Sequence, residues 1–293
     1  MIDSQKTKLS DGRTLGYAEY GPLIGVPVFY FHGFPGSRLE ATIVEDKLEG
    51  LNVHLVAIDR PGMGISSHQK NRTILDFPED VQELAEYLGL DNYGVLGVSG
   101  GGPYSLACAY RIPSETLVGC AVVSGSGPYH LTKDGLGKGE KTALFMAKNF
   151  PWLFRFILWL QLGRNVTNMV WWKKNYSKLG TGLPETDERI FNDQRVKESI
   201  IVKSIEAFRQ GSKGLVTDFR LYSEDWGFKF SEIPYETKVS LFHGEMDKNV
   251  PISIAESLSE QIPNCKTQFY SDEGHLSVLV NKVEEIMQTF TDA

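Results

Sequence analysis

The sequence predicts an α/β protein with a mostly parallel central sheet, helices on both faces of that sheet, and a helical insertion. Three observations predict this class: short runs of continuous apolar residues, helix-compatible segments between the runs, and one long stretch without such a run. Apolarity that is continuous rather than alternating indicates strands covered on both faces, as in a parallel sheet between layers of helices.

An antiparallel hairpin is expected first, because Lys8 to Tyr20 has the pattern of strand, turn and strand, with the turn at residues 10–13. Buried strands are expected next. The candidate runs are Val26 to Phe31, Val53 to Ile58, Tyr93 to Val98, Leu117 to Val123 and Val239 to Phe242, and the candidate last strand is Thr267 to Tyr270.

Helices are expected between these strands. From Asp80 to Leu88 the apolar side chains fall on one side of a helix that Gly89 ends, and Tyr104 to Tyr110 is also compatible with a helix. Ser253 to Gln261 and Leu276 to Phe290 have the same helical periodicity. Strand and helix therefore alternate through most of the chain.

The alternation stops in the middle of the chain. We expect a core formed by residues 1–127 and 228–293 and a helical cap insertion at 128–227. The insertion carries all five tryptophans, and we expect most of its aromatic side chains to pack it onto the core. Two alternatives are that some of them line an acyl pocket, or that Trp152, Trp159, Trp171 and Trp172 meet a membrane surface beside Lys173 and Lys174.

Composition and charge exclude several classes of protein. A chain of 293 residues that is 41% hydrophobic can bury a large core without disulfides or metal. A net charge of -7 is the wrong sign for tracking phosphates, so we expect no nucleic-acid partner. Cys108, Cys120 and Cys265 lack zinc-ligand spacing and are expected to be buried free thiols.

The compartment expected from the sequence is the cytoplasm. The first residues lack the basic start and apolar run of a signal peptide. The apolar segment Phe150 to Leu162 contains Pro151 and Arg155 and falls short of the roughly 20 residues that a bilayer requires. We therefore expect a cap or core helix there, and no membrane partner.

Ser99 is the candidate nucleophile. It lies in the pattern Gly97-Val98-Ser99-Gly100-Gly101, directly after one predicted strand and before a predicted helix. A serine in so sharp a turn needs small neighbours two positions away, because the chain there is strained and closely approached. Both positions are glycine.

A serine hydroxyl needs a general base and a group that orients the base. His275 follows the candidate last strand and so should reach the sheet edge where Ser99 lies. His32 and His243 each end a strand, where a hydrogen bond to local backbone is the simpler interpretation. His54, His68 and His130 have no supporting motif, and we expect solvent exposure or loop packing for them.

Asp247 is the candidate orienting acid, because it follows the strand Val239 to Phe242 and gives the chain order Ser99, Asp247, His275. Glu245 is a rival, Asp225 is a weaker one, and Asp247 could instead cap the following helix. An oxyanion also needs backbone donors. The loop at residues 31–37 and the N–H of Gly100 are candidates.

Taken together, these motifs resemble those of α/β-hydrolase-fold proteins, and the resemblance covers nearly all of the chain outside the insertion. They are His32-Gly33-Phe34-Pro35-Gly36, Asp59 to Ser66, Gly97 to Gly102, Gly244 to Pro251 and Gly274-His275. The resemblance implies a Ser99, His275 and Asp247 triad, oxyanion-hole N–H groups from Phe34 and Gly100, and a helical cap over the site.

The resemblance also narrows the chemistry. Epoxide hydrolases and haloalkane dehalogenases carry aspartate where this chain has Ser99, and proline iminopeptidases usually have tryptophan near the serine, where this chain has Gly100 to Gly102. We therefore expect a serine hydrolase that cleaves small apolar carboxylic esters through an acyl-enzyme, with no metal or organic cofactor. The alternatives are amide or carbon–carbon bond hydrolysis with the same triad, or a ligand-binding or signalling protein with little turnover.

Overall fold

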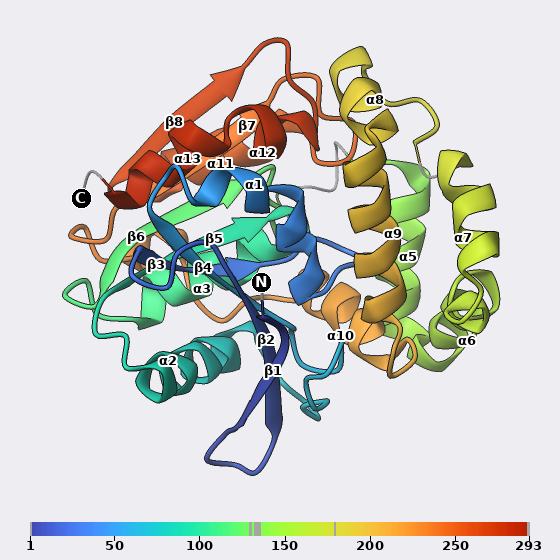
Figure 1. The fold of residues 1–293 in the computed structure, drawn as a ribbon, viewed down its shortest axis with the longest axis horizontal. Helices are drawn as coiled ribbons and strands as arrows, with labels where there is room; N and C mark the ends of the chain where they lie inside the picture. The colour runs from blue at the N-terminus through green and yellow to red at the C-terminus, as the bar shows by residue number, and fades with distance from the viewer. Residues whose placement is uncertain (1, 129–130, 132–135, 179, 292–293) are drawn as a thin grey trace.

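A central sheet of eight strands organises the protein (Figure 1). The computed structural model describes residues 2–128, 131, 136–178 and 180–291. The strand order is β1-β2-β4-β3-β5-β6-β7-β8; β1 and β2 are antiparallel, and the other strands run parallel to one another. The predicted fold class is therefore confirmed. The strands are β1 (Ile2–Lys8), β2 (Thr14–Tyr20), β3 (Val26–Phe31), β4 (Val53–Ile58), β5 (Tyr93–Val98), β6 (Leu117–Val123), β7 (Val239–Gly244) and β8 (Cys265–Tyr270).

The opening hairpin is longer than the sequence predicts. Its turn follows Lys8, which pairs with Thr14, but β1 already begins at Ile2. The first residues of β1 alternate little in polarity because this strand is at the sheet edge and most of its side chains are exposed. A pattern search based on buried strands therefore misses its start.

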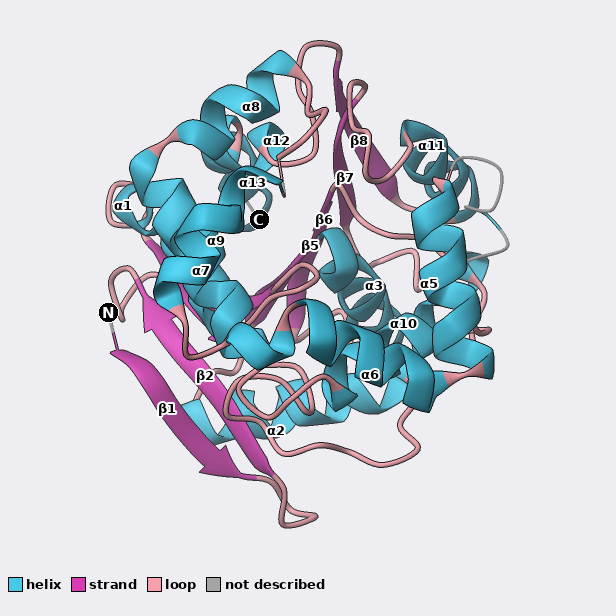
Figure 2. Ribbon diagram, turned by 90° about the vertical axis from the view of Figure 1, so that its right-hand side faces the viewer, coloured by secondary structure: helices cyan, strands magenta, loops and turns pink. Residues whose placement is uncertain are grey.

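Helices cover both faces of the sheet (Figure 2). On one face, the buried side chains of α2 (Phe77–Leu88), α3 (Gly102–Arg111) and α11 (Ile252–Gln261) share a core with the strands. On the other face, α1 (Glu45–Leu48), α12 (Ser277–Asn281) and α13 (Val283–Thr291) complete a second core. Alternate residues of the strands enter the two cores, which explains why the strands read as continuous apolar runs.

The predicted single helix from Leu276 to Phe290 is wrong, because the structure divides it at Lys282 into α12 and α13. The two helices have different partners: α12 contacts α8 and β7, whereas α13 lies against β6 and β3. Periodicity alone does not reveal such a break.

Helices fill the chain between β6 and β7, on the right of Figure 1. Two of the tryptophans there, Trp172 and Trp226, are buried as expected. Trp152 and Trp159 are exposed, so the expectation that the insertion buries its aromatic residues is wrong for them. No helix among the described residues combines the length and apolar character needed to cross a membrane. These helices include α5 (Lys138–Asn149), α6 (Pro151–Gln161), α7 (Met169–Asn175), α8 (Glu185–Asn192), α9 (Gln194–Ala207) and α10 (Lys213–Tyr222).

Candidate active site

Ser99 occupies a sharp turn between β5 and α3. Its backbone has a φ of 53°, in the left-handed region that non-glycine residues rarely adopt. A Cβ atom on Gly97 would lie 2.5 Å from the carbonyl oxygen of Gly101, and one on Gly101 would lie 2.0 Å from that of Phe31. The prediction that both flanking positions must be small is therefore confirmed.

His275 and Asp247 meet at the same edge of the sheet. The Nδ1 atom of His275 lies 2.7 Å from Oδ2 of Asp247, although 28 residues separate them. Asp247 follows β7, and its Oδ1 accepts the backbone N–H groups of Asn249 and Val250 at 2.8 and 2.9 Å. The carboxylate therefore closes the turn before α11 and also binds the imidazole.

The electrostatics of this pair favour an ion pair when His275 is protonated. Burial alone would lower the pKa of His275, but the charge and hydrogen bond of Asp247, with the charge of Asp187, raise it above its ordinary value of 6.5. Burial would raise the pKa of Asp247, but the charge and hydrogen bond of His275 hold it below its usual value. Asp247 is thus ionised at neutral pH.

The rival acids are placed elsewhere. Glu245 is exposed and bound through its backbone N–H to Tyr270, and Asp225 is exposed and accepts the N–H of Gly227. Of the groups weighed as the orienting acid, Asp247 alone contacts His275 among the described residues.

The other histidines have structural partners. Ring nitrogens of His32 and His243 lie 2.9 and 2.8 Å from the backbone carbonyls of Gly33 and Val250, as expected. His68 is half-buried beside Thr217. The expectation for His54 is wrong, because it is buried on β4 and lies 2.7 Å from the Glu19 carboxylate. His130 falls outside the described residues.

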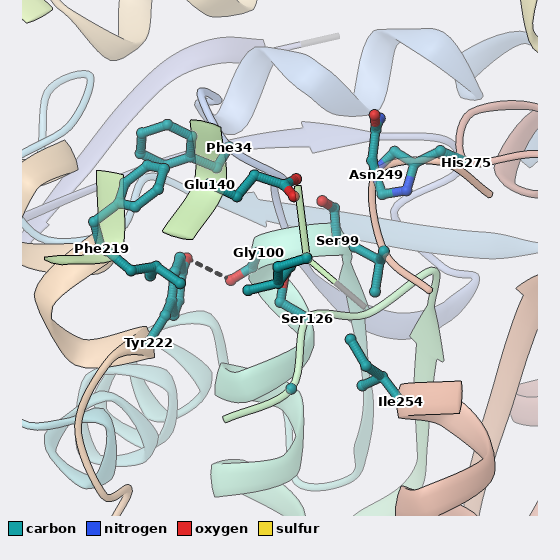
Figure 3. A pocket seen from close by; sticks show the side chains of 14 residues that line it. Phe34, Ser99, Gly100, Ser126, Glu140, Phe219, Tyr222, Asn249, Ile254 and His275 are labelled. Carbon is teal, nitrogen blue, oxygen red and sulfur yellow. Dashed lines mark hydrogen bonds between the residues drawn. The ribbon is translucent and has the colours of Figure 1, made fainter. Parts of the chain in front are cut away.

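Ser99 and His275 line a common pocket of about 320 Å³ (Figure 3). A second pocket of about 290 Å³ opens from the same place, and the two share Phe34, Ser99, Asn249 and His275. Within the described residues, Ser99 Oγ and the His275 ring are not hydrogen-bonded. Catalytic hydrogen bonds are often long before substrate binds, so this geometry is compatible with a nucleophile and base.

Two backbone segments border the pocket beside Ser99. A Cβ atom on Gly100 would lie 3.3 Å from Cβ of Phe34, so the two chains are adjacent. The carbonyl of Gly33, in the same peptide as the Phe34 N–H, accepts Nη2 of Arg60 at 3.1 Å. The Ser99 carbonyl, in the same peptide as the Gly100 N–H, accepts the N–H of Ser126 at 2.9 Å. Both peptide planes are thereby fixed.

The family described as alpha/beta hydrolase fold matches residues 26–282, nearly the whole chain. The protein belongs to the α/β hydrolase fold family. Among curated members, this α/β hydrolase is 24% identical to Lipase 3 of Moraxella sp. (strain TA144), over 99% of this chain and 83% of that protein. It is 25% identical to the bifunctional esterase/perhydrolase DCH of Acinetobacter calcoaceticus, over 90% of both chains.

Solved structures give the same fold. An esterase from Exiguobacterium antarcticum superposes on this α/β hydrolase with a TM-score of 0.69, 18% identity, and coverage of 99% of this chain and 98% of that one. The esterase RhEst1 from Rhodococcus sp. ECU1013 gives a TM-score of 0.69 at 18% identity, covering 100% and 99% of the two chains. At these identities the likeness concerns the fold alone.

A buried charged network supports the pocket of this α/β hydrolase, and the sequence gives no indication of it. The carboxylate of Asp218 on α10 accepts a hydrogen bond from Nε of Arg60 at 2.8 Å, and it also accepts one from Nη2 of Arg72. The Tyr222 hydroxyl donates to the Gly100 carbonyl at 2.7 Å and lies 3.3 Å from Asp218 (Figure 3). Arg60 also donates to the His32 carbonyl. Through Arg60 and Tyr222, the Asp218 carboxylate is thus linked to the backbone of both segments that border the pocket beside Ser99.

Asp187 is a second residue that sequence reasoning missed. This buried side chain on α8 accepts the backbone N–H groups of His275, Leu276 and Ser277 at 2.8, 3.0 and 2.8 Å. The three donors belong to the loop that carries the imidazole and to the first turn of α12. Asp187 therefore fixes the backbone of His275 from the segment between β6 and β7, 88 residues away in the chain.

Glu140 on α5 is a third unexpected residue. It lines the 320 Å³ pocket, and Figure 3 shows its carboxylate pointing into the space that Ser99 and His275 also face. Burial raises the pKa of Glu140, although the N–H of Gly137 and the charge of His275 oppose this effect. A carboxylate here disfavours the binding of a negatively charged group in this pocket.

Proposed function

We propose that this α/β hydrolase is a serine hydrolase that cleaves carboxylic esters with small apolar groups. The observation that carries the proposal is the 2.7 Å contact between His275 and Asp247 beside a pocket that Ser99 also lines. The relatives named as a lipase and as an esterase/perhydrolase support an ester as the substrate class. The positive φ of Ser99 supports a nucleophile presented by a strained turn.

In the proposed reaction, Nε2 of His275 takes the proton of Ser99 as the hydroxyl oxygen attacks the carbonyl carbon of the ester. Asp247 holds Nδ1–H and stabilises the imidazolium that forms. His275 then protonates the leaving alcohol and an acyl-enzyme remains. A water molecule, deprotonated by His275, releases the acid and restores Ser99.

The oxyanion of the tetrahedral intermediate is proposed to bind the N–H groups of Phe34 and Gly100. Each donor of this kind contributes about 3 to 4 kcal/mol to transition-state stabilisation when it is held in advance of the reaction. The bonds to the Gly33 and Ser99 carbonyls support this role, since they fix and polarise the same two peptide units.

The two pockets that meet at Ser99 fit the two sides of an ester. The 290 Å³ pocket is lined largely by apolar side chains, including Trp172, Phe191 and Ile200. We propose that it takes one apolar group and that the 320 Å³ pocket takes the other. Residues 128–227 are proposed as the cap over both, because α5, α8, α9 and α10 supply lining residues.

Covalent labelling tests the proposed function. A fluorophosphonate probe is expected to modify the wild-type protein at Ser99 and to leave Ser99→Ala unmodified, as read by intact-protein mass spectrometry. Ser126→Ala is the matched control, because Ser126 lines the same pocket and should not be the site of attack. Short p-nitrophenyl esters should be hydrolysed above the Ser99→Ala background. An unlabelled and inactive wild-type protein would favour the ligand-binding alternative.

The pH dependence provides a second test. Because the neutral form of His275 is the base and its pKa is raised, kcat/KM should fall as the pH drops through a midpoint above 6.5. Asp187→Asn should move this midpoint to lower pH, since one of the charges that raise the pKa of His275 is lost. The neighbouring exposed Glu188→Gln should leave it in place. An acid midpoint that is unchanged in Asp187→Asn would contradict the prediction.

A further inference from the structure

Helix α6 turns an apolar surface outward. Phe154 and Leu158 are buried on one side of this helix. On an adjacent side, the side chains of Trp152, Phe156 and Trp159 are 71%, 54% and 47% exposed. Large contiguous apolar patches are rare on soluble monomers and mark interaction sites. We call the following exposed residues of α5, α6 and their junction the aromatic face: Phe145, Phe150, Trp152, Phe156, Trp159 and Leu160.

The residues of the aromatic face adjoin one another. The rings of Phe156 and Trp159 stack with centroids 6.0 Å apart, and those of Phe145 and Phe150 lie 6.1 Å apart. Helices α5 and α6 contact each other, and Figure 1 places α6 and α7 at the margin of the molecule away from the sheet. The face is thus accessible to a large partner.

The chain segment that contains the aromatic face is basic, unlike the protein as a whole. Between Lys138 and Lys178 the sequence has eight Lys and Arg residues and one acidic residue, Glu140, in a chain of net charge -7. Glu140 points into the pocket, so its charge is directed inward. Lys148, Arg155, Lys173 and Lys174 are exposed, and none of the ion pairs within the described residues involves them.

We propose that the aromatic face docks on a lipid surface rich in anionic headgroups. Tryptophan and phenylalanine rings enter the boundary between headgroups and acyl chains, and surrounding Lys and Arg residues attract anionic lipids. A second copy of this chain fits this face less well, because it would bring two basic surfaces together. This proposal replaces the expectation of no membrane partner, which rested on an apolar segment too short to span a bilayer and on aromatic residues packing inward.

The aromatic face also adjoins the pocket at Ser99. Leu144 lines that pocket, and with Phe145 and Lys148 it lines a surface depression of about 270 Å³. Leu144 is therefore common to the pocket and to a depression at the edge of the aromatic face. Lipid docking goes beyond the proposed ester hydrolysis. It would place the wall of the pocket next to a lipid bilayer, in which apolar esters dissolve.

Vesicle co-sedimentation tests the proposal, with Ser99→Ala as the background so that binding is measured without turnover. The probes are vesicles of phosphatidylcholine alone and of equal amounts of phosphatidylcholine and phosphatidylglycerol. We expect binding to the anionic vesicles, weaker binding to the neutral ones, and loss of the difference at high salt. The screening length falls from about 10 Å at 0.1 M to about 3 Å at 1 M ionic strength.

Two sets of substitutions locate the contact. Combining Trp152→Ser, Phe156→Ser and Trp159→Ser should lower partitioning into anionic vesicles at least about tenfold. Combining Lys173→Glu and Lys174→Glu should lower it by a similar factor and abolish the preference for anionic lipid. The matched control is Leu23→Ser with Ile24→Ser, which removes exposed apolar side chains from the turn before β3 and should leave binding unchanged.

Binding that shows no anionic preference, or that the triple aromatic variant retains in full, would overturn the proposal. So would a concentration-dependent dimer that the triple aromatic variant disperses, because the face would then bind a second copy. The Ser99→Ala background separates these outcomes from the proposed hydrolysis, since failure of the chemistry cannot alter its vesicle binding.

Discussion

Asp247→Asn is expected to lower kcat/KM for an ester by about 10⁴-fold. The asparagine can still accept the backbone N–H groups of Asn249 and Val250 through Oδ1, so the turn before α11 should persist. Its amide nitrogen would then face Nδ1 of His275. Nδ1 would then accept a hydrogen bond from this amide, and the ring proton would move to Nε2. With Nε2 protonated, His275 could no longer accept the proton of Ser99.

Steady-state kinetics with a p-nitrophenyl ester measures this loss, and Glu245→Gln is the matched control. Glu245 is exposed only two residues away, so its substitution should leave kcat/KM within a factor of about two, as for most surface changes. A larger loss in Glu245→Gln than in Asp247→Asn would show that the acid is misassigned. The circular dichroism of both variants should match the wild type.

Asp218→Asn is expected to lower the free energy of unfolding by about 3 to 5 kcal/mol. The carboxylate lies between Arg60 and Arg72, whose side chains are 0% and 1% exposed. Burial would raise the pKa of Asp218, but the charges of these two arginines hold it below its usual value. Removing the negative charge leaves both buried guanidinium groups without a counter-ion among the described residues, and neither can release its proton at accessible pH.

Urea denaturation measures this change, since the free energy of unfolding falls linearly with denaturant concentration. Asp91→Asn makes the same chemical change at an exposed position and should shift stability by less than about 0.5 kcal/mol. Equal midpoints for the two variants would contradict the assignment of Asp218 as the counter-ion of the buried arginines.

The sequence was sufficient to predict the residues at the ends of the strands. Ser99 and Asp247 follow the buried strands β5 and β7, His275 follows the largely exposed edge strand β8, and parallel strands bring their carboxyl ends to one edge. This reasoning requires only local pattern and the geometry of a parallel sheet. The contact between His275 and Asp247 was therefore foreseeable before any coordinates.

The contacts made across the interior were not predictable in this way. Asp187 and Asp218 lie in helices whose sequences are equally compatible with an exposed aspartate at these positions. The neighbouring residues in the chain do not indicate which groups the two carboxylates bind. Exposure was also hidden, because Trp152 and Trp172 look alike in sequence but only Trp172 is buried. The partner and the exposure of a helical side chain depend on how the helices pack. A periodic pattern predicts which residues share a face of a helix, but it does not predict what packs against that face.

The contacts that Asp187 and Asp218 make on the two sides of the pocket limit which segments this enzyme can exchange with its relatives. A chimera that receives a foreign segment between β6 and β7 would lose the acceptor for the His275 loop and the counter-ion of Arg60 at once. A successful graft would have to carry equivalent carboxylates in register. The segment is thus an integral part of the proposed active site, and substrate range should be easier to alter by point changes within it than by exchanging it whole.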